Sequence, residues 1–285
     1  MLRMRPPAPV PGAARAQGND RLTPMRSLRF ERAGTTLTAL VRDGAGIPLV
    51  IVPGVMADAE SWRPVVDHIH LPNPVLVVNR RGRAPSGPLG DHYSVRTEID
   101  DLTLILDELG SDAHLFGWSY GGLIAVEAAT ERYDLRSLSL YEPVALPFAA
   151  DQVAPLRAAV AAGDLDRAVE IVNRDVSGFS AEYVAELRRS PAWAGLVPLA
   201  APLAAELAAL NAHSPALGRY PSLDMPVTLL VGERSEGGFP YGKPFALFAG
   251  ALPQARTIRI AGQGHLAHVH APDLLGKHIT DAVVR

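Results

Sequence analysis

A serine stands at the centre of the glycine-rich segment GWSYGG, residues 117–122. The pattern predicts a buried strand ending just before Ser119 and an amphipathic helix beginning just after it. On so sharp a turn the hydroxyl is exposed above the sheet, and the glycines at 117 and 121 let neighbouring backbone approach closely. The helix N-terminus adds amide groups and a partial positive charge. Residue types and spacing therefore predict that Ser119 is a nucleophile.

The segments around Ser119 alternate between strand and helix patterns. Short apolar runs bounded by glycine or proline predict buried strands, and apolar residues at helical spacing predict the intervening helices. This alternation predicts a mainly parallel sheet with helices on both faces. Strands are expected at 27–33, 35–43, 47–54, 74–82, 112–119, 135–143, 225–232 and 255–262, and helices at 58–70, 94–110, 120–133, 245–252 and from Pro272.

Residues 144–222 interrupt this alternation. They contain three helical patterns, many alanines and no plausible strand, which predicts a helical cap inserted between two parts of an α/β core, 26–143 and 223–285. Residues 1–25 combine Pro, Ala and Arg without periodicity and are predicted to form a flexible tail. Prolines interrupt any signal-peptide apolar region there, so a cytoplasmic location is expected. Met25 is an alternative start.

Composition excludes several classes of protein. The 285 residues include 27 basic and 30 acidic side chains, a formal charge of −3, which argues against a nucleic-acid partner. No apolar run approaches the roughly 18 residues that span a bilayer, so no membrane partner is expected. The chain has no cysteine, which excludes disulfides, thiolate nucleophiles and cysteine-bound metals. A small-molecule substrate is the expected partner.

On these features the chain resembles the α/β-hydrolase family from Arg26 to Arg285. The resemblance includes a third strand ended by Pro53-Gly54, the turn at residues 79–82, the turn that carries Ser119, a helical cap after the sixth strand, and a late GQGH at residues 262–265. It implies an eight-stranded core and a serine, acid, histidine order along the chain.

His265 is the predicted base. It follows the last predicted strand in the family's G-x-G-H pattern, where its imidazole would take the serine proton and return it to the leaving group. His268 and His270 are the alternatives. No carboxylate ligand stands in this segment before Asp273, so the three histidines do not predict a metal site.

The acid has three candidates. Most of the family places an aspartate about three residues beyond the seventh strand, where this chain has Ser235. The flanking Glu233 and Glu236 would serve with a shifted loop. Some relatives, haloalkane dehalogenases among them, place the acid after the sixth strand, where this chain has Glu142. Glu142 is preferred, and Glu236 and Glu233 stay open.

The resemblance also implies an oxyanion hole of two backbone N–H groups, those of Tyr120 and Val55. Met56 and Trp118 are expected to shape the substrate pocket beside them. Arg80, Arg81 and Arg83 follow the fourth strand and are interpreted as a structural turn rather than an anion site. No dinucleotide or Walker glycine motif follows any strand, so no cofactor is predicted.

The leading hypothesis is a cofactor-independent serine hydrolase acting on a small to medium apolar ester, thioester, lactone or related carbonyl compound. Serine at the nucleophile position disfavours haloalkane dehalogenase and epoxide hydrolase chemistry. The alternatives are a serine-type perhydrolase, a non-hydrolytic enzyme for C–C cleavage, cyclisation or elimination, and a ligand-binding homologue without turnover.

Overall fold

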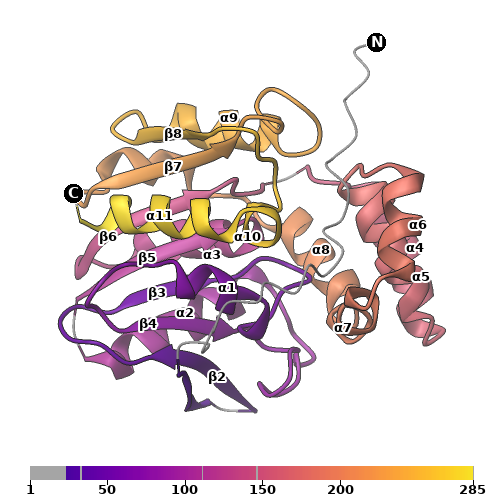
Figure 1. Ribbon diagram of the computed structural model, residues 1–285. Helices are drawn as coiled ribbons and strands as arrows, with labels where there is room; N and C mark the ends of the chain where they lie inside the picture. The colour runs from indigo at the N-terminus through magenta and orange to yellow at the C-terminus, as the bar shows by residue number, and fades with distance from the viewer. Residues whose placement is uncertain (1–23, 33, 111, 146, 285) are drawn as a thin grey trace, which may run out of the picture.

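The computed structural model describes residues 24–284 except 33, 111 and 146. Nearly all of the predicted tail, residues 1–25, lies outside the described residues. Eight strands form one sheet in the order β1-β2-β4-β3-β5-β6-β7-β8 (Figure 1). They are β1 (Arg26–Arg32), β2 (Thr35–Arg42), β3 (Leu49–Val52), β4 (Val75–Asn79), β5 (Ala113–Trp118), β6 (Leu135–Tyr141), β7 (Val227–Gly232) and β8 (Arg256–Ile260).

The sheet is parallel from β4 to β8, while β2 pairs antiparallel with both β1 and β4. Strands β3, β4 and β7 are buried along their whole length, as a parallel sheet covered on both faces requires. The predicted fold class, a mostly parallel eight-stranded α/β sheet, is confirmed.

Helices cover both faces of the sheet. Helices α1 (Arg63–Asp67) and α11 (Pro272–Val283) pack over one face, and α2 (Val95–Leu109), α3 (Tyr120–Ala129) and α9 (Gly242–Ala251) pack over the other. Strand alternation divides the core in the same way: Leu49 and Ile51 of β3 face the first group, and Val50 and Val52 face the second.

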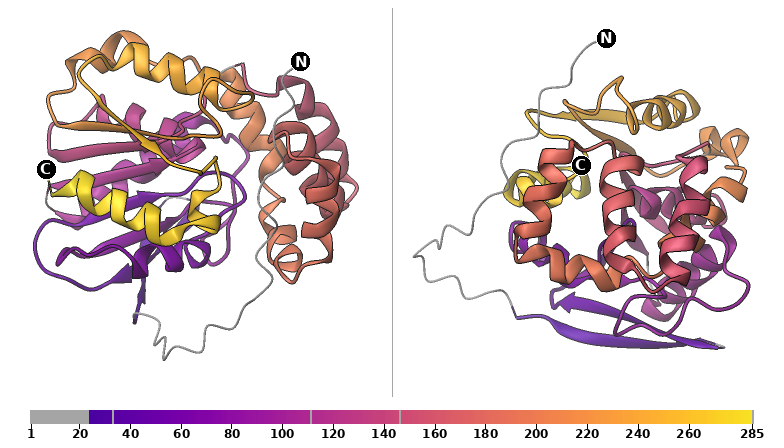
Figure 2. Two further views of the ribbon diagram at one scale, coloured as in Figure 1. Left: turned by 45° about the horizontal axis from the view of Figure 1, so that its top comes forward. Right: turned by 90° about the vertical axis from the view of Figure 1, so that its right-hand side faces the viewer.

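The described residues between β6 and β7 form helices and no strand. Most of these helices are grouped at one end of the sheet (Figure 2), whereas the last, η4 (Leu217–Ser222), packs against α9 through the stacked rings of Tyr220 and Phe248. The others are η2 (Ala150–Gln152), α4 (Val153–Ala161), α5 (Leu165–Ile171), the π-helix η3 (Val172–Val176), α6 (Ala181–Arg189), α7 (Ala192–Leu199) and α8 (Leu203–Ala212).

Within the described residues no single helix is long and apolar enough to cross a membrane, and α7 with α8 reaches that length and composition only as a pair bent by 55°. The short η1 (Glu60–Trp62) and α10 (Ala267–His270) complete the helices.

A pair of helical glycines tests how tightly the helices pack on the core. A Cβ added at Gly276 of α11 would lie 2.8 Å from the backbone of His68, whereas one at Gly250 of α9 would meet nothing within 4 Å. We expect Gly276→Ala to lower the free energy of unfolding by about 1–3 kcal/mol through overpacking. The control Gly250→Ala should raise it by up to about 1 kcal/mol through helix propensity. Urea denaturation measures both, and equal effects would contradict this packing.

Candidate active site

Ser119 occupies a strained turn between β5 and α3. Its φ of 57° and ψ of −122° lie in a region that costs a non-glycine residue about 1–3 kcal/mol. Close backbone contacts hold this turn: a Cβ on Gly121 would lie 2.1 Å from the Val52 carbonyl oxygen, and one on Gly117 would lie 2.5 Å from that of Gly121. Only glycine fits at these two positions, which explains their spacing around the serine.

The loop after β3 lies directly against the serine. A Cβ on Gly54 would approach the Ser119 Cβ to 2.8 Å. Val55 and Tyr120 line the same cavity as Ser119. Within the described part of the chain, neither the Val55 nor the Tyr120 backbone N–H donates a hydrogen bond. Because buried N–H groups are rarely left unpaired, these two are suited to receive a developing oxyanion.

His265 and Glu142 are joined by a buried hydrogen bond. Nδ1 of His265 lies 2.7 Å from Oε2 of Glu142, whose side chain is fully buried. The other carboxylate oxygen, Oε1, accepts the backbone N–H of Gly232 at 2.7 Å. Glu142 itself has a φ of 42°, so the end of β6 is strained, as the serine turn is. The structure thus brings together the base and the preferred acid of the sequence analysis.

Burial lowers the pKa of His265 below its usual 6.5, and the carboxylate of Glu142 partly opposes that shift. With Nδ1 facing the carboxylate, the neutral ring carries its proton on Nδ1, which leaves Nε2 free to accept one. The imidazole is therefore a base at neutral pH.

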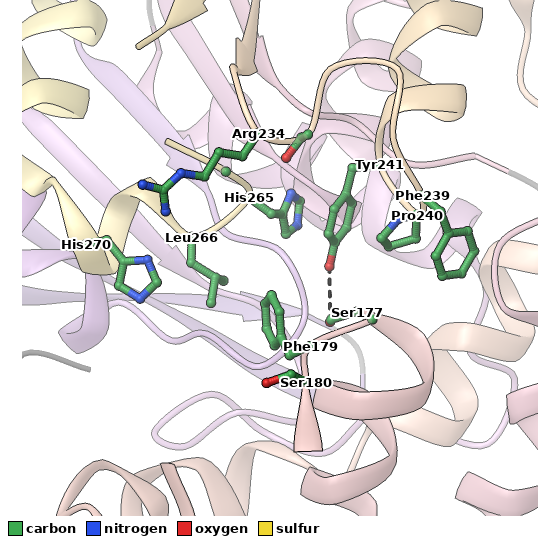
Figure 3. A pocket seen from close by; sticks show the side chains of 13 residues that line it. Ser177, Phe179, Ser180, Arg234, Phe239, Pro240, Tyr241, His265, Leu266 and His270 are labelled. Atoms are coloured by element: carbon green, nitrogen blue, oxygen red, sulfur yellow. Dashed lines mark hydrogen bonds between the residues drawn. The ribbon is translucent and has the colours of Figure 1, made fainter. Parts of the chain in front are cut away.

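Tyr241 covers the His265 ring. The two rings stack with centroids 3.5 Å apart and an angle of 9° between their planes, and the Tyr241 hydroxyl donates to Ser177 Oγ at 3.1 Å. Figure 3 shows Tyr241 beside His265 with its hydroxyl directed at Ser177. Sequence reasoning missed Tyr241, because the loop before α9 has no pattern that points to the histidine.

Ser119 and His265 line different cavities in this conformation. Among the described residues no hydrogen bond joins their side chains, and such bonds often form only once substrate is bound. The inner cavity, about 30 Å³ in volume, contains Ser119 and is lined mainly by aliphatic side chains of the cap. Its other lining residues are Val55, Tyr120, Val144, Phe148, Leu156, Val172, Val176, Leu203, Glu206, Leu207 and Leu210.

The alternative candidates lie elsewhere. Glu233 and Glu236 are exposed and both pair with Arg259, and Glu233 also accepts the Gly262 N–H. His268 stacks on Trp62, and burial lowers its pKa to about 3, so it stays neutral. In the described residues no group of three or more histidines and carboxylates could hold a metal ion.

The expected pocket residues Met56 and Trp118 line neither the inner cavity nor the one that contains His265. Trp118 points to the opposite face of the sheet from Tyr120, because the chain changes direction at Ser119. Its Nε1 donates to the His265 carbonyl oxygen at 3.0 Å. Trp118 therefore fixes the backbone of His265, and it does not shape either cavity as the sequence analysis had expected.

A buried charge cluster connects the cap to the loop after β3. Arg80 donates to the carbonyl oxygens of Pro53 at 2.9 Å and Gly54 at 3.0 Å. It also pairs with Glu98 of α2 and with Glu206 of α8, each at 2.7 Å. Burial lowers the pKa of Arg80, but the two carboxylates outweigh burial and raise it, so the guanidinium stays charged.

Glu206 shares its charge between two arginines. Arg83 Nη2 lies 2.9 Å from Glu206 Oε2, and the pKa of Glu206 is lowered because both guanidinium groups outweigh its burial. The third arginine, Arg81, pairs with Asp101 at 2.6 Å. These contacts fit the structural interpretation of the arginine turn, but the partner from the cap was not foreseen.

The comparisons with known proteins agree with this fold. Residues 49–276 match the model of the Alpha/beta hydrolase family, which is most of the chain. The protein therefore belongs to that family. It is similar to an alpha/beta hydrolase from Sphaerobacter thermophilus, with a TM-score of 0.76 and 25% identity over 90% of this chain and 99% of that one.

Curated relatives include Polyketide synthase ThaQ of Burkholderia thailandensis, 27% identical over 88% of this chain. Another is N-formylmaleamate deformylase of Pseudomonas putida, 34% identical over 35% of this chain. The chain spans 13% of the first relative's length and 38% of the second's. The family and its hydrolase relatives support an enzyme of the α/β-hydrolase type.

Because Glu206 balances two buried arginines, we expect its neutralisation to lower the free energy of unfolding strongly. Glu206→Gln would leave Arg80 and Arg83 buried with too little negative charge, and we expect the free energy of unfolding to fall by about 3–5 kcal/mol. The matched control is Glu60→Gln, which breaks an exposed pair with Arg63 and should cost less than about 1 kcal/mol. Urea denaturation of both variants measures these changes. If the two variants lose similar free energies of unfolding, the charge cluster does not stabilise the protein as expected.

Proposed function

We propose that the protein is a serine-dependent hydrolase of small, apolar acyl esters or thioesters, with Ser119, His265 and Glu142 as its catalytic triad. The observation that carries the proposal is the buried hydrogen bond between His265 Nδ1 and Glu142 Oε2. It leaves Nε2 of His265 available as a base. Lactones and related carbonyl compounds fit the same chemistry.

The proposed reaction has two halves. Ser119 Oγ attacks the acyl carbonyl carbon while His265 Nε2 takes the hydroxyl proton, and the N–H groups of Val55 and Tyr120 stabilise the oxyanion. The bond to the leaving group then breaks, and His265 returns the proton to that group. Water attacks the acyl-enzyme by the same route, which releases a carboxylic acid and free Ser119.

The inner cavity supports a short acyl group. Its walls are aliphatic and aromatic side chains, and its volume of about 30 Å³ is small. The single acid in its lining, Glu206, is neutralised by Arg80 and Arg83 and so does not favour a charged acyl chain. Relatives whose names describe acyl or amide chemistry, such as the deformylase, are consistent with attack on a carbonyl carbon.

A fluorophosphonate probe tests the nucleophile. We expect it to label the wild-type protein at pH 7–8 and to leave Ser119→Ala unlabelled, because phosphonylation requires an activated serine hydroxyl. Ser222→Ala removes an exposed serine far from the triad and should label like the wild type. Labelling of Ser119→Ala, or none in the wild-type protein, argues against a serine hydrolase.

The acid is tested with three matched substitutions and butyrate esters. Glu142→Gln keeps an oxygen for the Gly232 N–H but presents an amide to His265, so we expect kcat/KM to fall by about 10³–10⁴-fold. Glu236→Gln and Glu233→Gln should stay within about twofold, because each loses only an exposed pair with Arg259.

The pH profile gives a second readout for the same variants. Catalysis needs neutral His265, so wild-type kcat/KM should rise with pH to a plateau, with a midpoint below 6.5. Glu142 stabilises the protonated ring, so its removal should move the midpoint lower still. An unmoved midpoint in Glu142→Gln, or a large loss in Glu236→Gln, assigns the acid elsewhere.

A further inference from the structure

A second cavity opens on the outer side of His265. Its volume is about 190 Å³, and its walls come from the loop after β7, the loop after β8 and the cap segment before α6 (Figure 3). Phe179, Phe239, Tyr241 and Leu266 give it an apolar and aromatic lining. Phe239 is 64% exposed, which places it at an open rim.

Tyr241 separates this outer cavity from the inner one. Its ring lies against His265 and its hydroxyl is bonded to Ser177, and both partners line the outer cavity. On its other side it contacts Phe148, a lining residue of the inner cavity, with ring centroids 5.9 Å apart. Tyr241 thus contacts side chains that line each of the two cavities, and a substrate that reaches both Ser119 and His265 must extend into both cavities.

The lining of the outer cavity includes a cationic side chain and no acidic one. None of its thirteen lining residues is Asp or Glu, while Arg234 and His270 are both among them. Arg234 is exposed and forms no direct ion pair within the described part of the chain. Its charge acts on the adjacent Glu233, whose pKa is lowered by the Gly262 N–H first and then by Arg259 and Arg234, but Glu233 lies outside the cavity lining. Burial and the nearby Arg234 charge both lower the pKa of His270, so its ring is neutral at neutral pH and can donate one N–H to a ligand that also contacts Arg234.

Resting on the proposed function, we infer that the outer cavity is the leaving-group subsite, and that it takes an alcohol or thiol whose apolar or aromatic body carries an anionic group recognised by Arg234 with His270. The inner cavity holds Ser119 and hence the acyl group. His265 lines the outer cavity, and its Nε2 must protonate the departing atom there. The two halves of the substrate are thereby assigned to the two cavities.

Arg234 begins close to the loop that carries His265. A Cβ on Gly264, the residue before His265, would lie 3.7 Å from the Arg234 Cβ, and both Arg234 and His265 line the outer cavity. A carboxylate on a benzene ring, para to the scissile oxygen, carries its charge away from the reacting atom on a rigid body, and its ring suits the aromatic walls. Guanidinium groups bind carboxylates in a planar, bidentate geometry.

Three phenyl butyrates that differ only in their para substituent test this subsite: carboxylate, carboxamide and trimethylammonium. Dividing each kcat/KM by the rate of hydroxide-catalysed hydrolysis of the same ester removes differences in intrinsic reactivity. We expect the wild-type protein to favour the carboxylate over the trimethylammonium ester by about tenfold or more, and 0.5 M NaCl to reduce that ratio because the site is open to solvent.

Substitutions at Arg234 should lower the carboxylate-to-trimethylammonium ratio, and the ratio should fall further as the side chain becomes more negative. Arg234→Gln should reduce it by about tenfold, and Arg234→Glu should reverse the preference. The matched control is Arg157→Gln. Arg157 is also exposed, forms no ion pair among the described residues, and lies on α4 outside both cavities, so its substitution should leave the ratio unchanged. The product 4-hydroxybenzoate should also bind the wild-type protein more tightly than Arg234→Gln by calorimetry.

The outcomes separate the subsite from the proposed function. The subsite alone is overturned if Ser119 is required for hydrolysis but the three esters are hydrolysed with the same corrected kcat/KM. It is also overturned if the carboxylate-to-trimethylammonium ratio is the same in Arg234→Glu as in Arg157→Gln. No hydrolysis of any ester contradicts the proposed function, and 4-hydroxybenzoate binding then still decides whether Arg234 recognises an anion.

Discussion

The hydrogen bond between Glu142 and His265 is the contact on which the site depends. It joins residues 123 positions apart, and Glu142 also accepts the N–H of Gly232, so one buried carboxylate connects the ends of β6, β7 and the loop after β8. A buried carboxylate is costly unless its oxygens are satisfied. The sheet order, which places β7 between β6 and β8, supplies both partners. Trp118 and Tyr141 then fix the histidine loop by donating to the carbonyl oxygens of His265 and Gly264.

A second constraint couples the cap to the proposed oxyanion hole. Arg80 donates to the Pro53 and Gly54 carbonyl oxygens and so sets the path of the chain just before Val55. The same guanidinium is balanced by Glu206 of the cap. Because a buried guanidinium needs its counter-charge, the geometry of this loop depends on the cap being in place. The cap would therefore support the proposed oxyanion hole as well as lining the proposed acyl cavity.

The fold and the serine turn were predictable because their signals are local. Apolar runs ended by glycine marked the strands, and the glycines around Ser119 are required because a Cβ at Gly121 would lie only 2.1 Å from the Val52 carbonyl oxygen. The sequence narrowed the acid to three residues and favoured Glu142, but it left Glu236 and Glu233 open, because which loop reaches His265 depends on how strands far apart in sequence are ordered. Tyr241 and Glu206 carried no local signal: each acts through a partner brought near by the fold alone.

The position of the acid also shapes the outer cavity. With Glu142 at the end of β6 facing His265, the loop after β7 needs no carboxylate directed at the imidazole. The two glutamates of this loop, Glu233 and Glu236, instead pair with the exposed Arg259. Ser235, which lies between them in sequence, lines the outer cavity. A negative charge at Ser235 would have neutralised the adjacent Arg234. Because the carboxylate that contacts His265 comes from β6, the cavity wall beside His265 has no acidic side chain, which suits the proposed anionic leaving group.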